Sequence, residues 1–128
     1  MLFRISDLMT RTLRTPLSPE ESFSDDPLRM MRAARFMAQL QVNPVPELTK
    51  AVGDMGERIS IVSMERVRAE LDKLMVADRP SAGLWFLIDT GLIDHFFPEI
   101  RGMRLEQDPI HRHKDVLTHT LEIGRAHV

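Results

Sequence analysis

The amino-acid sequence predicts an all-α fold of short helices, and three observations lead to that prediction. Apolar residues recur at three- and four-residue intervals, as they do along one face of a helix. Proline, serine and aspartate stand where such segments begin, and proline or glycine stands where they end. An alternation of apolar and polar residues, which would indicate a strand, extends no further than Ile59 to Val62.

The composition is that of a globular chain, since 43% of its 128 residues are hydrophobic and 28% are charged. Cysteine is absent, which excludes disulfides, cysteine-based zinc sites and a cysteine nucleophile. The longest uncharged stretch, Phe36 to Pro46, is far shorter than the ~20 apolar residues of a membrane span, so we expect no membrane contact. The net charge of −2 restricts any nucleic-acid contact to a local patch.

The first helix is predicted from about Pro27 to Gln41, and the 24 residues at the N-terminus are expected to be irregular. The run Ser24-Asp25-Asp26-Pro27 is typical of a helix start. Carboxylates stabilise the positive end of the helix dipole, and proline fits the first turn.

Three more helices follow in the prediction. One opens at Pro46 and weakens near Gly53 and Gly56, and the next begins after Ser63 as N-cap and runs to about Val76. The last of the three starts near residues 78–80 and ends at Gly91, a plausible C-cap, with one further turn over 92–97. We expect a loop over 102–109 and a final helix that starts around 113–115.

Charged residues gather at the start of the first predicted helix. At the helical period, Asp25, Arg29 and Arg32 fall within about 60° of one another, with Asp26 beside them. One interpretation is a solvated helix face whose ion pairs contribute ~0.2–0.5 kcal/mol each. The other is a site for a planar polar ligand such as a nucleobase, in which a carboxylate accepts from an exocyclic amine and a guanidinium donates to ring nitrogens and carbonyls.

A second cluster lies near the C-terminus, where His111, His113, Asp115 and His119 occur within nine residues. Three imidazoles and one carboxylate are a possible ligand set for zinc, iron or manganese. The alternative is an ordinary helix start with an aspartate in its first turn and exposed histidines.

One segment matches a known motif in the order and spacing of its residues. It runs Asp25-Asp26-x-x-Arg29-x-x-Arg32-x-x-Arg35-Phe36 and follows Leu13-Arg14-Thr15-Pro16 and Ser22-Phe23. This segment resembles the neck motif of bacterial tRNA nucleotidyltransferases, the CCA-adding enzymes and their poly(A) polymerase relatives. The resemblance implies that Asp26 and Arg29 pair with the base of CTP or ATP. It places Asp25 where the family has a glutamate, one methylene longer, and Arg32 near the phosphates or in the same pocket.

The resemblance covers about residues 12 to 122. Ser63-Met64-Glu65-Arg66 is similar to a helix that follows the neck motif, and we interpret Glu65 and Arg66 as parts of a capped helix with local ion pairs. Residues 83–100 are similar to the next family segment, which we interpret as structural. Residues 113–121 resemble the opening of an HD phosphohydrolase domain, in which His119 matches the first metal ligand. The His-Asp pair that completes such a site is expected beyond Val128, so we assign no metal ligand.

The resemblance also implies a division of the chain. We expect residues 1–24 to be the tail of an α/β nucleotidyltransferase head, 25–107 the helical neck that binds nucleotide and RNA, and 108–122 the start of an HD domain. Residues 123–128 match the translation of a sequencing adapter and are expected to be a non-native tail. The head of this family holds Mg²⁺ with an Asp-x-Asp pair beside a Gly-Gly turn, and neither pattern occurs in this sequence. We therefore assign no catalytic residue and expect the chain alone to be inactive.

The implied function is addition of CMP and AMP, from CTP and ATP, to the 3′ end of tRNA in the cytoplasm. Two alternatives belong to other classes. One is a helical RNA-binding or protein-interaction module without chemistry. The other is an HD-type metal-dependent phosphohydrolase that uses His111, His113, Asp115 and His119.

Overall fold

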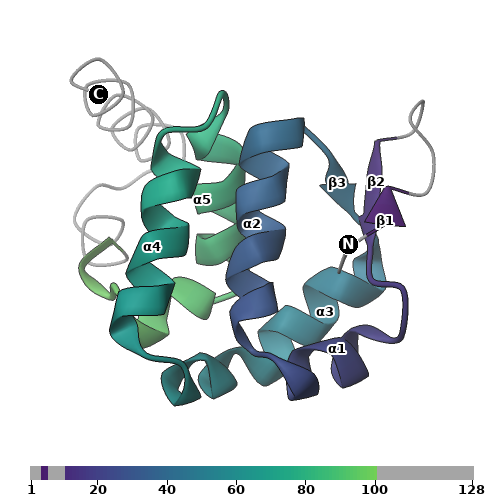
Figure 1. The fold of residues 1–128 in the computed structure, drawn as a ribbon, viewed down its shortest axis with the longest axis horizontal. Coiled ribbons are helices and arrows are strands. Elements are labelled where there is room, and N and C mark those ends of the chain that lie inside the picture. The colour runs from purple at the N-terminus through teal and green to yellow at the C-terminus, as the bar shows by residue number, and fades with distance from the viewer. Residues whose placement is uncertain (1–3, 6–10, 101–128) are drawn as a thin grey trace.

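The computed structural model of the chain describes residues 4–5 and 11–100, and this part of the chain is mostly helical (Figure 1). The predicted all-α class is confirmed. The described residues form five α-helices and two 3-10 segments: α1 Pro19–Asp25, α2 Leu28–Leu40, α3 Pro46–Met55, η1 Gly56–Ile61, α4 Met64–Met75, α5 Pro80–Asp89 and η2 Leu92–His95.

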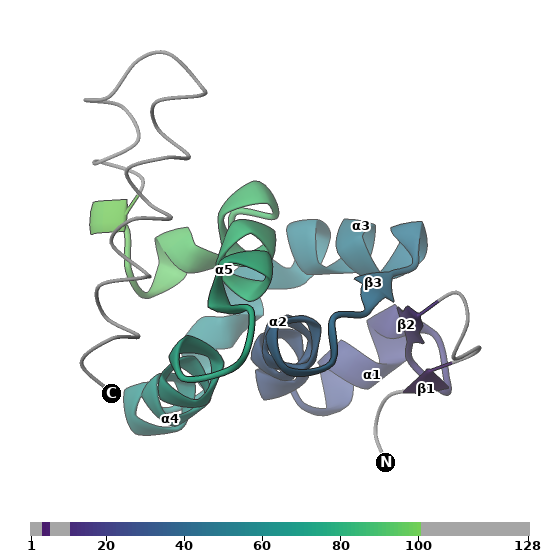
Figure 2. The ribbon, with the colours of Figure 1, turned by 90° about the horizontal axis from the view of Figure 1, so that it is seen from above.

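The helices lie in two layers, and α2 is the middle helix of the first layer. Seen from above, α4, α2 and α1 form one row, and α5 and α3 form the other (Figure 2). The side of α2 that faces inward is entirely apolar and buried, through Met30, Ala33, Ala34, Met37 and Ala38. None of the described helices has the length and apolar character that a membrane crossing requires.

A close approach brings α5 against α2. A Cβ atom at Gly83 would lie 2.5 Å from the backbone oxygen of Ala34 and 2.8 Å from Cδ1 of Leu74. Glycine at position 83 and alanine at position 34 therefore let the two helices, and α4 beside them, pack closely.

The helix boundaries follow the predicted start and stop signals. Helix α2 begins one residue after Pro27 and ends before Gln41, which adopts a left-handed conformation with a φ of 54°. The Oγ of Ser63 accepts a hydrogen bond from the backbone N–H of Arg66 at 3.3 Å, so Ser63 is the N-cap of α4 as predicted. Gly91 has a φ of 80° and ends the α5 segment.

The N-terminal segment differs from its prediction, because residues 12–14 form a strand and residues 19–25 form a helix. Strand β2, Thr12–Arg14, pairs antiparallel with β1, Arg4–Ile5, and parallel with β3, Asn43–Pro44. Strands of two or three residues are too short to show an alternation in the sequence.

Helix α1 was also missed, although its start carries the usual signals. Ser18 is its N-cap, Pro19 occupies the first turn and Glu20 and Glu21 follow. The similar signals of residues 24–27 mark the start of the second helix, α2, and not of the first. Asp25 is therefore the last residue of α1 and does not open α2. The predicted loop over 102–109 and the predicted final helix lie outside the described residues.

Candidate functional site

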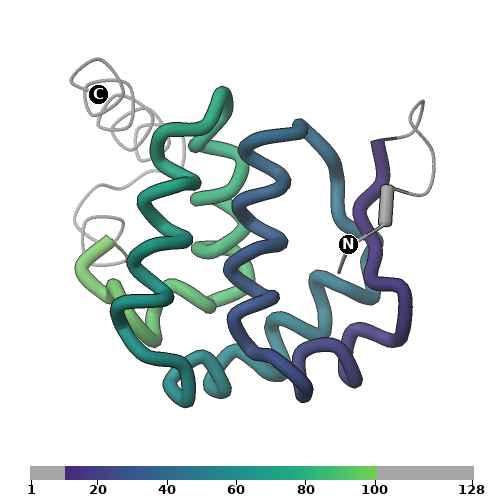
Figure 3. The backbone as a smooth tube through the Cα atoms, in the orientation of Figure 1, coloured from purple at the N-terminus to yellow at the C-terminus, as the bar shows by residue number. Residues whose placement is uncertain are grey.

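The junction between α1 and α2 contains the predicted site residues, and the backbone turns sharply there (Figure 3). Asp26 has an extended backbone, and its N–H donates to the carbonyl of Ser22 at 3.1 Å. Its Oδ1 accepts from the N–H of Leu28 at 3.1 Å. Asp26 thus caps the start of α2, and its side chain is 26% exposed.

Arg29 is fixed at the same junction. Its Nη1 donates to the carbonyl of Ser22 at 3.1 Å and is 3.3 Å from the hydroxyl of that residue. The C-terminal end of a helix carries partial negative charge, so a guanidinium stabilises this end of α1. The backbone N–H of Asp26 and the guanidinium of Arg29 therefore donate to the same oxygen atom, the Ser22 carbonyl.

Arg58, from η1, makes a similar contact. Its Nη2 donates to the carbonyl of Ser24 at 3.3 Å, so two guanidiniums cap the C-terminal end of α1. Sequence reasoning did not single out Arg58. Its contact spans 34 residues of sequence, which no local spacing indicates.

The other two arginines of the motif pair with a buried carboxylate on α4. The Nε of Arg32 lies 3.2 Å from Oε1 of Glu70, and the Nε of Arg35 lies 2.7 Å from Oε2. The Glu70 side chain is only 5% exposed, and a buried carboxylate needs such partners. The Nη1 of Arg32 also lies 4.0 Å from Oδ2 of Asp26.

Two earlier interpretations need correction. Asp25 does not share a helical stripe with Arg29 and Arg32, because the helix is interrupted at Asp26 and Asp25 is an exposed residue at the end of α1. The stripe is also not a simple solvated face with pairs inside one helix. Its strongest partner, Glu70, comes from a different helix.

Glu70 itself was missed, although the sequence carries a signal for it. It lies three residues after Val67 and four before Leu74, and both of these are buried on α4. A carboxylate on the apolar face of a helix predicts a cationic partner across the interface. Two other charged residues of that helix, Glu65 and Arg66, are exposed near its capped start, in agreement with a structural interpretation.

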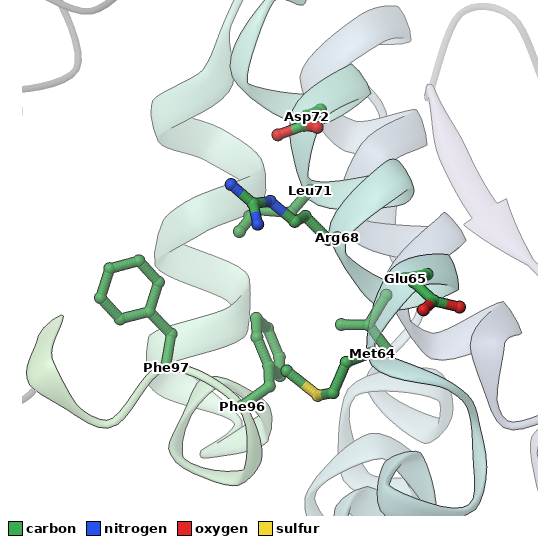
Figure 4. A pocket seen from close by; sticks show the side chains of 8 residues that line it. Met64, Glu65, Arg68, Leu71, Asp72, Phe96 and Phe97 are labelled. Carbon is green, nitrogen blue, oxygen red and sulfur yellow. The ribbon is translucent and has the colours of Figure 1, made fainter.

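A separate apolar groove runs along α4. Met64, Arg68 and Leu71 form one wall, and Phe96 and Phe97 face them across a cavity of about 460 Å³ (Figure 4). Met64 is 60% exposed and Phe97 is 38% exposed. Such a groove suits an apolar group, but it lies apart from the motif residues at the α1–α2 junction.

The described part of the chain, residues 4–5 and 11–100, holds no group of three histidine, aspartate or glutamate side chains able to bind a metal ion. The predicted cluster of His111, His113, Asp115 and His119 lies outside the described residues. Asp25 and Asp26 also do not form a metal pair, because one is exposed at the end of α1 and the other caps α2.

The sequence of the chain is similar to a family model and to several curated proteins. Residues 42–103 match a family model described as the probable RNA- and SrmB-binding site of polymerase A. The CCA-adding enzyme of Levilactobacillus brevis is 41% identical over 88 residues, which are 69% of this chain and 22% of that enzyme. The CCA-adding enzyme of Lactobacillus gasseri is 36% identical over 104 residues, 81% of this chain and 25% of the enzyme.

A third relative is the CC-adding tRNA nucleotidyltransferase of Halalkalibacterium halodurans, 33% identical over 111 residues, which are 87% of this chain and 28% of that protein. The helical fold and the matched segment relate this chain to the region that the family model describes as a probable RNA-binding site of polymerase A. The chain belongs to the family of CCA-adding tRNA nucleotidyltransferases and poly(A) polymerases. It spans about a quarter of the length of these curated relatives.

Proposed function

We propose that this chain selects the nucleotide and binds RNA in an enzyme that adds CMP and AMP, from CTP and ATP, to the 3′ end of tRNA. The observation that carries the proposal is that the carboxylate of Asp26 and the guanidinium of Arg29 are both anchored at the α1–α2 junction, the first by the N–H of Leu28 and the second by the Ser22 carbonyl. Both side chains are held by backbone groups, which fixes their positions before a ligand arrives. The similarity to enzymes named for CCA addition supports the choice of substrates.

The chemistry of the two groups fits cytosine and adenine. Both bases carry an exocyclic amine, and in uracil and guanine a carbonyl oxygen takes its place. The Asp26 carboxylate would accept from the amine and repel the carbonyl. The Nη1 of Arg29 is engaged with Ser22, which leaves its second terminal nitrogen to donate to the ring nitrogen or carbonyl of the base.

Two further residues of the motif complete the proposed pocket. Arg32 borders it, since its Nη1 lies 4.0 Å from Oδ2 of Asp26. Asp25 lies at its exposed edge, next to Asp26 in sequence. We assign no catalytic role to any residue of this chain, because it offers no Asp-x-Asp pair for the Mg²⁺ ions that phosphoryl transfer requires.

The domain assignment is also part of the proposal. Residues 11–100 share one core, in which Leu13 and Phe23 are fully buried together with the helices that follow. The predicted boundary at residue 24 falls inside α1, so we place the N-terminal limit of the nucleotide-selecting unit before Thr12. We keep residues 108–122 as the proposed start of an HD domain and 123–128 as a non-native tail. The proposed tRNA substrate places the protein in the cytoplasm.

Activity is best tested in a chimera with an enzyme that carries its own catalytic head. The aligned segment of the Lactobacillus gasseri CCA-adding enzyme, 104 residues long, would be replaced by the matching residues of this chain. We expect the chimera to extend tRNA that lacks its 3′ CCA with CTP and ATP and not with UTP or GTP. The chain alone should bind this tRNA in a gel-shift assay and give no extension.

The variant Arg29→Ala tests the proposed base contact. In the chimera it should lower the ratio of kcat/KM for CTP and ATP over UTP and GTP by roughly 10- to 150-fold, since a hydrogen bond from a charged group contributes ~1.5–3 kcal/mol. Arg58→Ala is the matched control, because Arg58 caps the same end of α1 and is no part of the motif. It should lower the melting temperature and leave the nucleotide ratio unchanged. If Arg29→Ala and Arg58→Ala both kept the nucleotide ratio of the parent chimera, Arg29 would be a structural cap and not a base contact.

A further inference from the structure

We propose that Glu70 is a positioning residue for nucleotide selection, because it holds Arg32 back from the carboxylate that recognises the base. This inference rests on the proposed function and extends it to a second helix. Glu70 lies on α4, 38 residues after Arg32 in sequence, and its two ion-pair partners, Arg32 and Arg35, both belong to α2.

The contacts of Arg32 define a three-residue chain. Its Nε donates to Oε1 of Glu70 at 3.2 Å, while its Nη1 stands 4.0 Å from Oδ2 of Asp26, at the outer limit of an ion pair. The other oxygen of Asp26 is bound to the N–H of Leu28. Oδ2 is thus the oxygen that remains to accept from a base amine, and its nearest cation is an arginine that Glu70 restrains.

Arg35 keeps Glu70 in its place. Its Nε lies 2.7 Å from Oε2, its side chain is 18% exposed, and its guanidinium sits 5.0 Å from the ring centroid of Phe36. The carboxylate of Glu70 therefore has one cation on each oxygen. The Arg35 contact is an ion pair without hydrogen-bond alignment, whereas Arg32 donates a hydrogen bond to Oε1, and the two cations together hold the buried carboxylate beside Arg32.

Loss of the Glu70 charge has a directional consequence. Arg32 would then have one carboxylate in reach, that of Asp26, and would close the 4.0 Å gap to form a direct ion pair. An Asp26 oxygen that is occupied by a guanidinium competes poorly for the exocyclic amine of cytosine or adenine. The preference for amine-bearing bases should therefore fall even though Asp26 and Arg29 are both intact.

The test measures the ratio of kcat/KM for CTP and ATP over UTP and GTP in the chimera. Glu70→Gln, which keeps the shape of the side chain, should lower this ratio roughly tenfold, which corresponds to about 1.4 kcal/mol. The double variant E70Q/R32Q removes the competing cation as well. Because Arg32 borders the proposed pocket, this variant should lower kcat/KM for all four nucleotides alike, but the ratio should return to within about threefold of the original, a difference of ~0.7 kcal/mol. Glu65→Gln, the same change at an exposed position of α4, should leave the ratio as it was.

The double variant separates positioning from mere stability. If Glu70 only stabilises the helix interface, E70Q/R32Q should be no more selective than Glu70→Gln, and that result would overturn the inference. An unchanged ratio in Glu70→Gln would overturn it too. If Glu70→Gln does not fold, the double variant decides alone: a ratio near the original supports the inference, and a tenfold loss contradicts it. A parent chimera without nucleotide preference would instead refute the proposed function.

Discussion

The two faces of α2 are held in different ways. The inner face consists of small or flexible apolar side chains, all buried, and lies so close to α5 that Gly83 has no room for a Cβ atom. The outer face carries Arg29, Arg32 and Arg35, and each of these is fixed by a few oxygen atoms of α1 or α4. Packing therefore sets where α2 lies, and single polar partners set where its arginines point.

The largest effect on stability is expected from Gly83→Ala, which breaks the inner face. The new Cβ would meet the Ala34 oxygen at 2.5 Å, so α5 must move away from α2. We expect the free energy of unfolding in urea to fall by about 1–3 kcal/mol, as for other overpacked cores. The higher helix propensity of alanine offsets this by up to ~1 kcal/mol.

Gly53→Ala is the matched control for this substitution. Gly53 is an exposed residue of α3, and the nearest atom to a Cβ there, the oxygen of Thr90, is 3.9 Å away. Alanine should raise the free energy of unfolding by ~0.5–1 kcal/mol at this position. If both variants were stabilised, the close contact between α2 and α5 would not exist.

A smaller effect is expected at the start of α4, the helix that brings Glu70 to the outer face. Ser63→Ala removes the hydroxyl that accepts from the N–H of Arg66, and thermal or urea unfolding should show a loss of about 1 kcal/mol. Ser63→Asp keeps an acceptor at the N-cap and should stay within a few tenths of a kcal/mol of the parent, since the two caps are about equally favourable. An alanine variant as stable as the aspartate variant would contradict the assigned cap.

The smallest effect is expected at Gln41, where both faces of α2 end. Its φ of 54° suits glycine, so Gln41→Gly should raise the free energy of unfolding by up to about 1 kcal/mol. Gln41→Ala at the same backbone angle should give no gain. The free energy of unfolding of both variants would be measured in urea. If the glycine variant were no more stable than the alanine variant, the left-handed C-cap at Gln41 would be contradicted.

Sequence patterns predicted the elements that have clear ends. Pro46, Ser63 and Pro80 start their helices as expected, because an N-cap or first-turn proline acts within one turn of chain. The short strands and α1 escaped prediction. A seven-residue helix shows barely two turns of periodicity, and the pairing of Leu13 with Pro44 depends on chain distant in sequence.

The same limit applies to the candidate site: local spacing could be read from the sequence, and contacts between elements distant in sequence could not. The spacing of Asp26 and Arg29 identified the motif, and the structure places the Asp26 N–H and the Arg29 guanidinium on the Ser22 carbonyl, while their role toward a base stays a prediction. The spacing assigned Asp25 to the same helix as Arg29, because it assumed a continuous helix. The backbone is in fact extended at Asp26, so Asp25 belongs to α1. Glu70 lay beyond local patterns altogether, since an ion pair between two helices is decided by how those helices pack.

The central position of α2 also bears on the entropy of ligand binding. This helix lies between α4 on one side and α1 on the other, with α5 against it in the second layer (Figures 1 and 2). Its amide hydrogens should exchange with solvent mainly through unfolding of the whole unit, because no local opening frees it from all three neighbours. A ligand that binds where α2 begins then meets a preorganised surface, so little conformational freedom is lost on binding.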